Sequence, residues 1–207
     1  MSLSNLLSKR KLYMILHVIC AAYNRAIPLR ILIDSFLVQT NTNWKLYVIH
    51  DGEIPTNVLD IIKQYNDERI TFEYTKVRTA HSGFLNRDMM IKKTIGADED
   101  FVMSTNDDNY YVPTFVDEML KLITPTAGII YCDMVHSHFG YSVLSTVLQV
   151  YYIDLGAFAV RLPLAKRVGI KASSDIADGL FAQDCLTECL RIGMTTHKVE
   201  KILYIHN

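Results

Sequence analysis

The sequence of 207 residues is poor in cysteine, and its four cysteines form neither a C-x-x-C pair nor a zinc-binding spacing. This argues against a structural zinc site and against a disulfide framework. We therefore expect buried, reduced thiols and a cytoplasmic location. The cysteines are Cys20, Cys132, Cys185 and Cys189.

A block of like charges is also missing, because 21 Lys and Arg residues balance 22 Asp and Glu residues, for a formal net charge of -1. A surface that binds nucleic acid needs clustered basic side chains to displace counterions, so a polynucleotide partner is excluded. Any anionic ligand must be small, and its charge must be neutralised locally, for instance by a metal ion.

The chain has no hydrophobic run long enough to cross a membrane. Residues 12–22 are apolar and follow Lys9, Arg10 and Lys11, which superficially resembles a signal peptide. The run contains His17, however, and it is shorter than the roughly 20 residues that a transmembrane helix needs. We interpret it as a buried first strand and expect no transmembrane segment.

Hydrophobic residues make up 50% of the chain, and stretches typical of strands alternate with stretches typical of helices. This content excludes disorder, and the alternation predicts a single α/β domain over residues 1–207 with a mostly parallel central sheet flanked by helices. We expect the segment 133–145 to be a loop that lines a site. Expected strands are 13–21, 44–49, 69–75, 101–104, 128–131, 157–161 and 198–205, and expected helices are 28–37, 56–65, 86–95 and 179–191.

Polar residues follow three of the expected strands, at Tyr23-Asn24-Arg25, His50-Asp51-Gly52 and 106–109. Ligands bind beyond the carboxyl ends of strands in such sheets, although each segment alone is equally typical of an ordinary turn. The adjacent carboxylates Asp107 and Asp108 would repel each other unless a cation neutralised them. Oxygen ligands of this kind suit Mn²⁺ or Mg²⁺, and the alternative is an Asx-turn or a helix cap.

The order of several motifs resembles the nucleotide-sugar-dependent glycosyltransferases of the GT-A (Rossmann-like) fold, in particular the large, mostly inverting family that includes polysaccharide synthases. The resemblance covers nearly the whole chain and is more specific than any of its parts. The motifs are Ala22-Tyr23-Asn24-Arg25, Ser35 to Thr40, Asn43 to Leu46, Asp51-Gly52, Asp107-Asp108, Gln183-Asp184, Gly193 and Leu203-Tyr204.

The resemblance implies that residues 12–110 form a nucleotide-sugar-binding half and residues 111–207 an acceptor-side half. Asp51 would accept a hydrogen bond from the base, with uracil expected. Arg87 would reach the base or the diphosphate, and its alternative is a solvated helix arginine. The implied nucleotide-binding residues are Ala22, Tyr23, Arg25, Asp51, Arg87 and Asp107.

The resemblance also implies the metal and catalytic residues. Asp108 would bind the Mn²⁺ or Mg²⁺ that bridges the phosphates, and His206 would complete the metal shell unless it is structural or solvated. Asp184 would act as the general base. His136 and His138 would line the acceptor side or lie on the surface.

The implied reaction is metal-dependent, inverting transfer of a sugar from a nucleoside-diphosphate sugar, expected to be a UDP-sugar, to a hydroxyl of a glycan or another acceptor. A retaining transferase and a non-catalytic binding module remain alternatives, since His50 and Gln183 stand where the family has acids.

The absence of a Q-x-x-R-W motif argues against a processive synthase. The absence of a glycine-rich loop after the first strand argues against a nucleotidyltransferase. The chain is short for a complete enzyme, so we expect further domains in a longer protein.

Overall fold

Four parallel strands form the first half of the sheet in the computed structural model, which describes residues 14–79, 83–171 and 174–207. They lie in the order β3-β2-β1-β4. All of β1 is buried, because it has a strand on each side and helices on both faces. This confirms the strand expected there, although residues 12 and 13 lie outside the described part. The strands are β1 (Leu16–Ala22), β2 (Trp44–His50), β3 (Ile70–Tyr74) and β4 (Phe101–Asn106).

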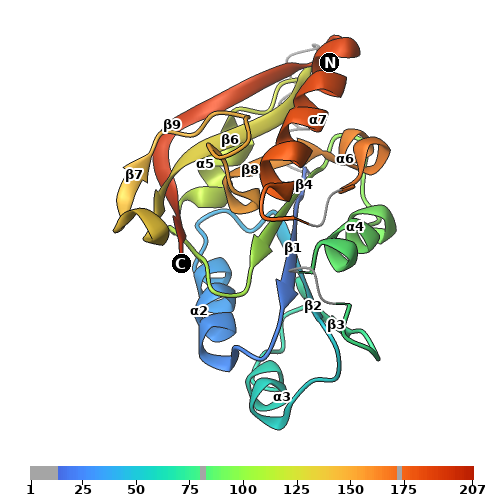
Figure 1. The fold of residues 1–207 in the computed structure, drawn as a ribbon, viewed down its shortest axis with the longest axis vertical. Helices are drawn as coiled ribbons and strands as arrows, with labels where there is room; N and C mark the ends of the chain where they lie inside the picture. Colours follow the sequence, from blue (N-terminus) through green and yellow to red (C-terminus); the bar gives the residue numbers. More distant parts are fainter. Residues whose placement is uncertain (1–13, 80–82, 172–173) are drawn as a thin grey trace, which may run out of the picture.

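Helices connect these strands and cover the sheet on both faces (Figure 1). α2 (Ala26–Leu37) buries the apolar stripe that its spacing predicts, and α3 (Thr56–Ile62) packs against it. α4 (Phe84–Lys93) packs against β1 and against α6 (Leu162–Val168).

The second half extends the same sheet with strands of mixed direction. From β4 onward the order is β8-β6-β9-β5, with β7 paired to β6. β8 is antiparallel to both neighbours, and β9 is parallel to β6. The α/β fold class is thereby confirmed. The elements are β5 (Tyr110–Tyr111), α5 (Phe115–Lys121), β6 (Ala127–His136), β7 (Ser142–Leu144), β8 (Phe158–Arg161), α7 (Ala177–Arg191) and β9 (Thr195–His206), with short 3₁₀ turns η2 (Ser137–Phe139) and η3 (Leu155–Ala157).

The loop expected over residues 133–145 is wrong for most of its length. β6 continues to His136, and β7 pairs antiparallel with its end to form a hairpin. Burial alternates along the continuation, because Cys132 and Met134 are buried while Asp133 and Val135 are only half-buried, although the pairing with β9 shifts register on both sides of Asp133. The turn between β6 and β7 contains η2 and a left-handed Gly140.

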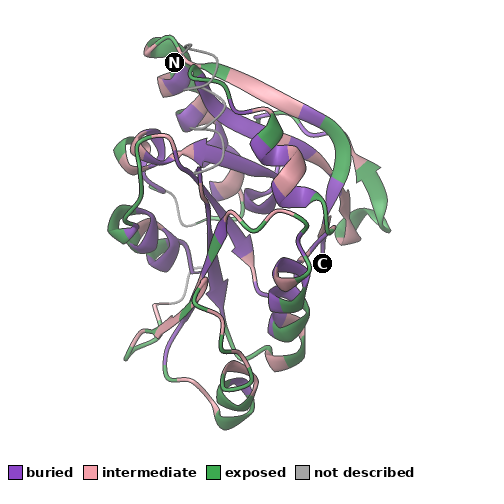
Figure 2. Cartoon of the chain, turned by 180° about the vertical axis from the view of Figure 1, so that it is seen from behind, coloured by how far each residue is buried: buried purple, intermediate pink, exposed green. Residues whose placement is uncertain are grey.

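Aromatic packing joins the two halves below the site. The ring of Tyr111 lies 4.9 Å from Phe36, 4.5 Å from Phe115 and 5.1 Å from Tyr204. Gly156 lies against these rings, since a Cβ there would approach Tyr204 Cζ to 2.6 Å. Figure 2 shows this buried interior along the sheet, with exposed residues on the outer faces of the helices. Tyr111 OH also donates to Thr105 Oγ1 at 2.8 Å, so Tyr111 connects β9 to the end of β4. Within the described residues, no helix has the length and apolar character needed to cross a membrane.

Candidate active site

Three adjoining cavities follow the carboxyl ends of β1, β2 and β4 and then the ends of β6 and β9. The first, of about 310 Å³, is lined by residues that include Tyr23, Arg25, Asp51, Arg87, Asp108 and His206. The second, of about 390 Å³, shares Arg87 and His206 with the first and adds Asp154 and Asp178. The third, of about 310 Å³, shares Asp154, Asp178 and His206 with the second. The predicted strand-end residues therefore do meet along one cleft.

The adjacent acids Asp107 and Asp108 lie side by side with the guanidinium of Arg25 between them. Arg25 Nη2 is 2.5 Å from Asp107 Oδ1, and Arg25 Nη1 contacts Asp108 Oδ2. Tyr23 N–H donates to Asp107 Oδ2 at 2.9 Å. Burial raises the pKa of Asp107, and the positive charge of Arg25 opposes that rise. Arg25 thus neutralises the repulsion that the sequence pattern predicts.

The alternative of a helix cap at these acids is wrong. The next helix, α5, begins eight residues after Asp107, and its N-cap position is Thr114. The carboxylate of Asp107 instead reaches across to β1 through Tyr23. Asp108 lines the first cavity, whereas Asp107 is fully buried behind it, and neither acid lies at the start of a helix.

The residues fit a divalent cation that takes part of its ligands from a bound diphosphate. Asp108 Oδ1 and His206 Nδ1 are buried without a hydrogen-bond partner, and both residues line the first cavity. No cluster of three or more His, Cys, Asp or Glu side chains within the described ranges is arranged to hold a metal on its own. Mg²⁺ and Mn²⁺ sites that bind nucleotides commonly use one or two carboxylates and fill the remaining positions with phosphate oxygens and water.

Asp51 is buried at the carboxyl end of β2 and faces the first cavity. Its Oδ1 accepts hydrogen bonds from Thr79 N–H at 2.8 Å, Thr79 Oγ1 at 2.7 Å and Asn86 Nδ2 at 3.0 Å. Arg78 Nε lies 3.9 Å from its Oδ2. These contacts fix the orientation of the carboxylate, as a residue that reads a base requires.

His50, which occupies a position where the resemblance leads us to expect an acid, has a structural role. Its Nδ1 lies 2.9 Å from Gly52 O, and its Nε2 accepts from Asn24 N–H at 3.2 Å. With Nδ1 protonated, both contacts are hydrogen bonds. Asn24 has a φ of +54°, so the imidazole holds the left-handed turn that places Tyr23 and Arg25.

Arg78 is a site residue that the sequence did not indicate. Its guanidinium lies 3.8 Å from the centre of the Tyr23 ring, and both side chains line the first cavity. A cation stacked on an aromatic face forms a flat wall that suits a nucleobase or a phosphate. No motif or spacing singles out this arginine, because it lies in a coil segment between β3 and α4.

Arg87 is buried where the first and second cavities meet, so the alternative of a solvated helix arginine is wrong. Its Nη2 donates to Asn106 Oδ1 at 2.5 Å and to Thr105 O at 3.3 Å. Burial lowers its pKa, and the carboxylates of Asp178 and Asp154 oppose that shift. The start of α4 lies close to β1 because Gly83, at φ +71°, has no side chain to clash with Ala21, whose Cβ would lie 2.8 Å from a Cβ on the glycine.

A pair of acids that the sequence analysis missed, Asp154 and Asp178, lines the second and third cavities. Asp154 accepts hydrogen bonds from Gly156 N–H at 2.7 Å and Tyr204 OH at 2.6 Å. Burial raises the pKa of Asp178 well above its usual range, and the neighbouring Asp154 carboxyl raises it further by its charge and by a hydrogen bond. A carboxyl group with a raised pKa is a stronger proton acceptor than an ordinary one.

A signal for Asp178 was available in the spacing of α7. Four buried residues of that helix recur at helical spacing on one face. Asp178 lies on the same face, one turn before Phe181, which is the first of them. Asp184 falls outside that stripe. The buried residues in question are Phe181, Ala182, Cys185 and Cys189.

Asp184, predicted as the general base, does not join the other site residues. It lines none of the three cavities, its side chain is 47% exposed, and its Oδ2 accepts from Lys171 Nζ at 3.0 Å. Its surroundings form a separate surface pocket that also contains Arg167 and Glu188.

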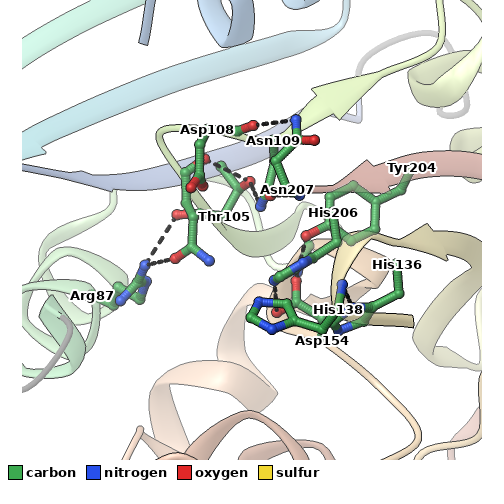
Figure 3. Close-up of polar contacts among 12 residues, drawn as sticks. Arg87, Thr105, Asp108, Asn109, His136, His138, Asp154, Tyr204, His206 and Asn207 are labelled. Atoms are coloured by element: carbon green, nitrogen blue, oxygen red, sulfur yellow. Dashed lines mark hydrogen bonds and ion pairs between the residues drawn. The ribbon is translucent and has the colours of Figure 1, made fainter. Parts of the chain in front are cut away.

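His206, at the end of β9, lies among the rings predicted for the acceptor side (Figure 3). It stacks on His136 with ring centres 4.1 Å apart, and the centre of the His138 ring lies at 5.5 Å. Its Nε2 lies 3.7 Å from Asp154 Oδ2. Burial lowers the pKa of His136, and so does the neighbouring His206. All three histidines line the third cavity, so His136 and His138 are placed beside the acid pair.

Several solved structures share this fold. TarS from S. aureus has a TM-score of 0.75 at 18% identity over 94% of this chain and 37% of that one. TarS 1–349 in complex with UDP-GlcNAc has a TM-score of 0.76 at 17% identity over 93% of this chain and 58% of that one. Mannosyltransferase PcManGT from Pyrobaculum calidifontis, in complex with GDP-Man and Mn²⁺, has a TM-score of 0.70 at 17% identity over 99% of this chain and 63% of that one. The chain therefore spans less than two thirds of the length of these proteins.

No curated protein matches the sequence. The model of glycosyl transferase family 2, however, matches residues 17–160, which include β1, β2, β4 and the acid pair Asp107-Asp108. With its GT-A fold, the chain belongs to glycosyl transferase family 2.

Proposed function

We propose that this chain transfers a sugar from a UDP-sugar to a hydroxyl group of an acceptor, with inversion at the anomeric carbon. The observation that carries the proposal is one continuous cleft that has Asp108 at one end and Asp178, whose pKa is raised, at the other. The family match and the neighbours solved with UDP-GlcNAc and GDP-Man support a nucleotide-sugar donor.

The donor end of the cleft is the first cavity. Asp51 would accept a hydrogen bond from the uracil, and the loop that contains Ala22 would lie along the nucleotide. Asp107 would lie near the ribose, and Tyr23 and Arg78 would form a wall of the cavity. The buried cation of Arg87 would attract the diphosphate.

Asp108 would hold a divalent cation, Mn²⁺ or Mg²⁺, with His206 beside it. When bound, that ion would stabilise the negative charge that develops on the leaving diphosphate. A neighbour solved with Mn²⁺ and the partnerless oxygen of Asp108 support this assignment. Arg25 contacts Oδ2 of Asp108 and not Oδ1, so its guanidinium would lie beside the ion and oppose its binding by charge repulsion.

We assign the general base to Asp178 and withdraw that role from Asp184. Asp178 lines the second and third cavities, so it can reach an acceptor hydroxyl placed between the donor sugar and the hairpin. It would take the proton of that hydroxyl as the oxygen attacks the anomeric carbon and the bond to the diphosphate breaks. General base catalysis of this kind contributes about 10²–10⁴-fold to a rate.

The test is donor turnover by three proteins in the presence of Mn²⁺, followed by NMR of the sugar. The wild type should release UDP from its donor, Asp178→Asn should lose about 10²–10⁴-fold in rate with unchanged donor affinity, and Asp184→Asn should match the wild type. Loss of activity in Asp184→Asn alone would restore Asp184 as the base. Retention of the anomeric configuration would contradict the inverting mechanism, and no turnover of any UDP- or GDP-sugar would favour a binding module.

The four cysteines are all buried and unpaired, which supports action in a reducing compartment such as the cytoplasm. The share of each neighbour that this chain covers supports further domains in a longer protein.

A further inference from the structure

The third cavity differs in character from the other two. It lies beyond the acid pair Asp154 and Asp178, and its outer wall is formed by η2, the β6–β7 hairpin and the segment before η3. At about 310 Å³ it has room for a ligand of its own beyond the donor. Its shared acids make it continuous with the cavity in which Asp178 faces the donor end.

Two aromatic side chains at this cavity are turned toward solvent. Tyr151 is 78% exposed and Phe139 is 58% exposed, and both line the cavity. Tyr151 also has a φ of +70°, a left-handed conformation that a bulky residue rarely adopts. A strained backbone that holds a large ring in water is typical of binding sites, because no internal packing accounts for it.

The ionisable groups that line the cavity are aspartates and histidines. Asp154, Asp175 and Asp178 line it, and the lining residues within the described ranges include no lysine or arginine. Carboxylates accept hydrogen bonds from hydroxyl groups and repel phosphates and other anions.

We propose that the third cavity is a subsite for a neutral pyranose, which makes the acceptor an uncharged sugar. One face of its ring would stack on Tyr151, and its hydroxyl groups would donate to the carboxylates, with the reacting hydroxyl at Asp178. A pyranose presents flat C–H faces and a rim of hydroxyl groups, which matches a site made of exposed rings and acids. The inference rests on the proposed transferase function, since it depends on the place of Asp178 at the donor end.

The test is saturation-transfer NMR with methyl glycosides of glucose, galactose, mannose and N-acetylglucosamine, in the presence of UDP and Mn²⁺. The variant Tyr151→Gly removes the ring at a φ that glycine adopts without strain, so the fold should survive. Tyr151→Phe keeps the ring. Tyr74→Gly is the matched control, since Tyr74 is 57% exposed on β3, away from all three cavities.

We expect at least one methyl glycoside to bind the wild type, Tyr151→Phe and Tyr74→Gly alike, and Tyr151→Gly to bind it about tenfold more weakly. Equal binding by Tyr151→Gly, or no binding by any methyl glycoside, would overturn the proposal. Binding of glycerol 3-phosphate or of detergent micelles in place of the sugars would also overturn it, in favour of an anionic or a lipid acceptor. Thermal stabilisation by UDP is recorded on the same samples, so failure of the sugar subsite with UDP still bound is distinguishable from failure of the proposed function.

Discussion

The cleft contains several carboxyl groups, and the surroundings of each one determine what it can do. The carboxylates of Asp107 and Asp108 both contact the guanidinium of Arg25. The pKa of Asp178, in contrast, is raised by burial and by the neighbouring Asp154. Asp184, on the same helix as Asp178, is exposed and pairs with Lys171. Residue type alone does not distinguish a base from a surface acid, because the difference is created by what surrounds each carboxyl group.

The raised pKa of Asp178 predicts the pH dependence of transfer. A general base must be deprotonated, so kcat/KM should rise with pH until Asp178 has lost its proton. Asp154→Asn removes the charge that helps to raise this pKa, and its amide oxygen can still accept from Tyr204. We therefore expect the rising limb of the pH profile to move to lower pH in Asp154→Asn. An unchanged profile would show that another group titrates.

The same shift predicts an effect on stability. A carboxyl group whose folded pKa is raised stabilises the folded state at low pH, and this contribution is lost as the pH rises through the folded pKa. Asp178→Asn cannot ionise, so its melting temperature should exceed that of the wild type at neutral pH, and the gap should close in acid. A gap that stays constant with pH would contradict the shift.

Arg25 gives a prediction about metal affinity in the absence of donor. Its guanidinium contacts both acids, so a divalent cation at Asp108 Oδ1 would bind beside its positive charge. Arg25→Gln should therefore bind Mn²⁺ more tightly than the wild type, by about tenfold if that repulsion is worth about 1.4 kcal/mol. Electron paramagnetic resonance of free Mn²⁺ measures this, with Arg30→Gln on the exposed face of α2 as the control. Weaker Mn²⁺ binding by Arg25→Gln would show that the arginine supports the metal site.

At the scale of elements, the beginning of α7 determines where Asp178 lies. A Cβ at Gly179 would approach Val150 Cα to 2.3 Å, so glycine lets the helix meet the segment before Asp154. The methyl group of Gly179→Ala must push α7 away from the backbone of Val150. Overpacking of this kind lowers the free energy of unfolding by about 1–3 kcal/mol. We expect a lower melting temperature and reduced transfer, while Leu190→Ala, at an exposed position of the same helix, should change neither. Normal activity in Gly179→Ala would mean that the position of Asp178 is not critical.

Elements with a strong periodic pattern could be predicted from the sequence, and short ones could not. The stripe on α2 and the buried run of β1 follow directly from their spacing. α5 and α6 have seven residues each, and their helical period does not stand out. α3 has the same length but could be predicted, because its apolar spacing continues beyond its end to Tyr65, which packs against the core. β6 was expected to end at Tyr131, because the residues that follow include polar ones. Their alternation between buried and half-buried positions arises from the fold, in which β7 pairs with this part of β6.

At the scale of the whole molecule, the order of the strands assembles the site from distant segments. β1 lies between β2 and β4, so the strand ends that follow residues 22, 50 and 106 meet at one edge. β9 brings His206 to the same edge, where Asn207 Nδ2 donates to Asp108 O at 2.7 Å. The order of the sequence motifs predicted that the ends of β1, β2 and β4 lie together. The positions of Asp154 and Arg78 in the site depend on tertiary packing, which no local sequence pattern indicates.

The most direct test of the central claim is thermal unfolding with UDP, with and without Mn²⁺. Ligand at 100 times its Kd stabilises the folded state by about 2.7 kcal/mol, which raises the melting temperature of a chain of this size by roughly 5–10 °C. We expect that rise in the wild type only when UDP and Mn²⁺ are both present, and no rise in Asp108→Ala. An equal rise in Asp108→Ala or in chelator, or no rise in the wild type, would contradict a metal-dependent nucleotide site at Asp107 and Asp108.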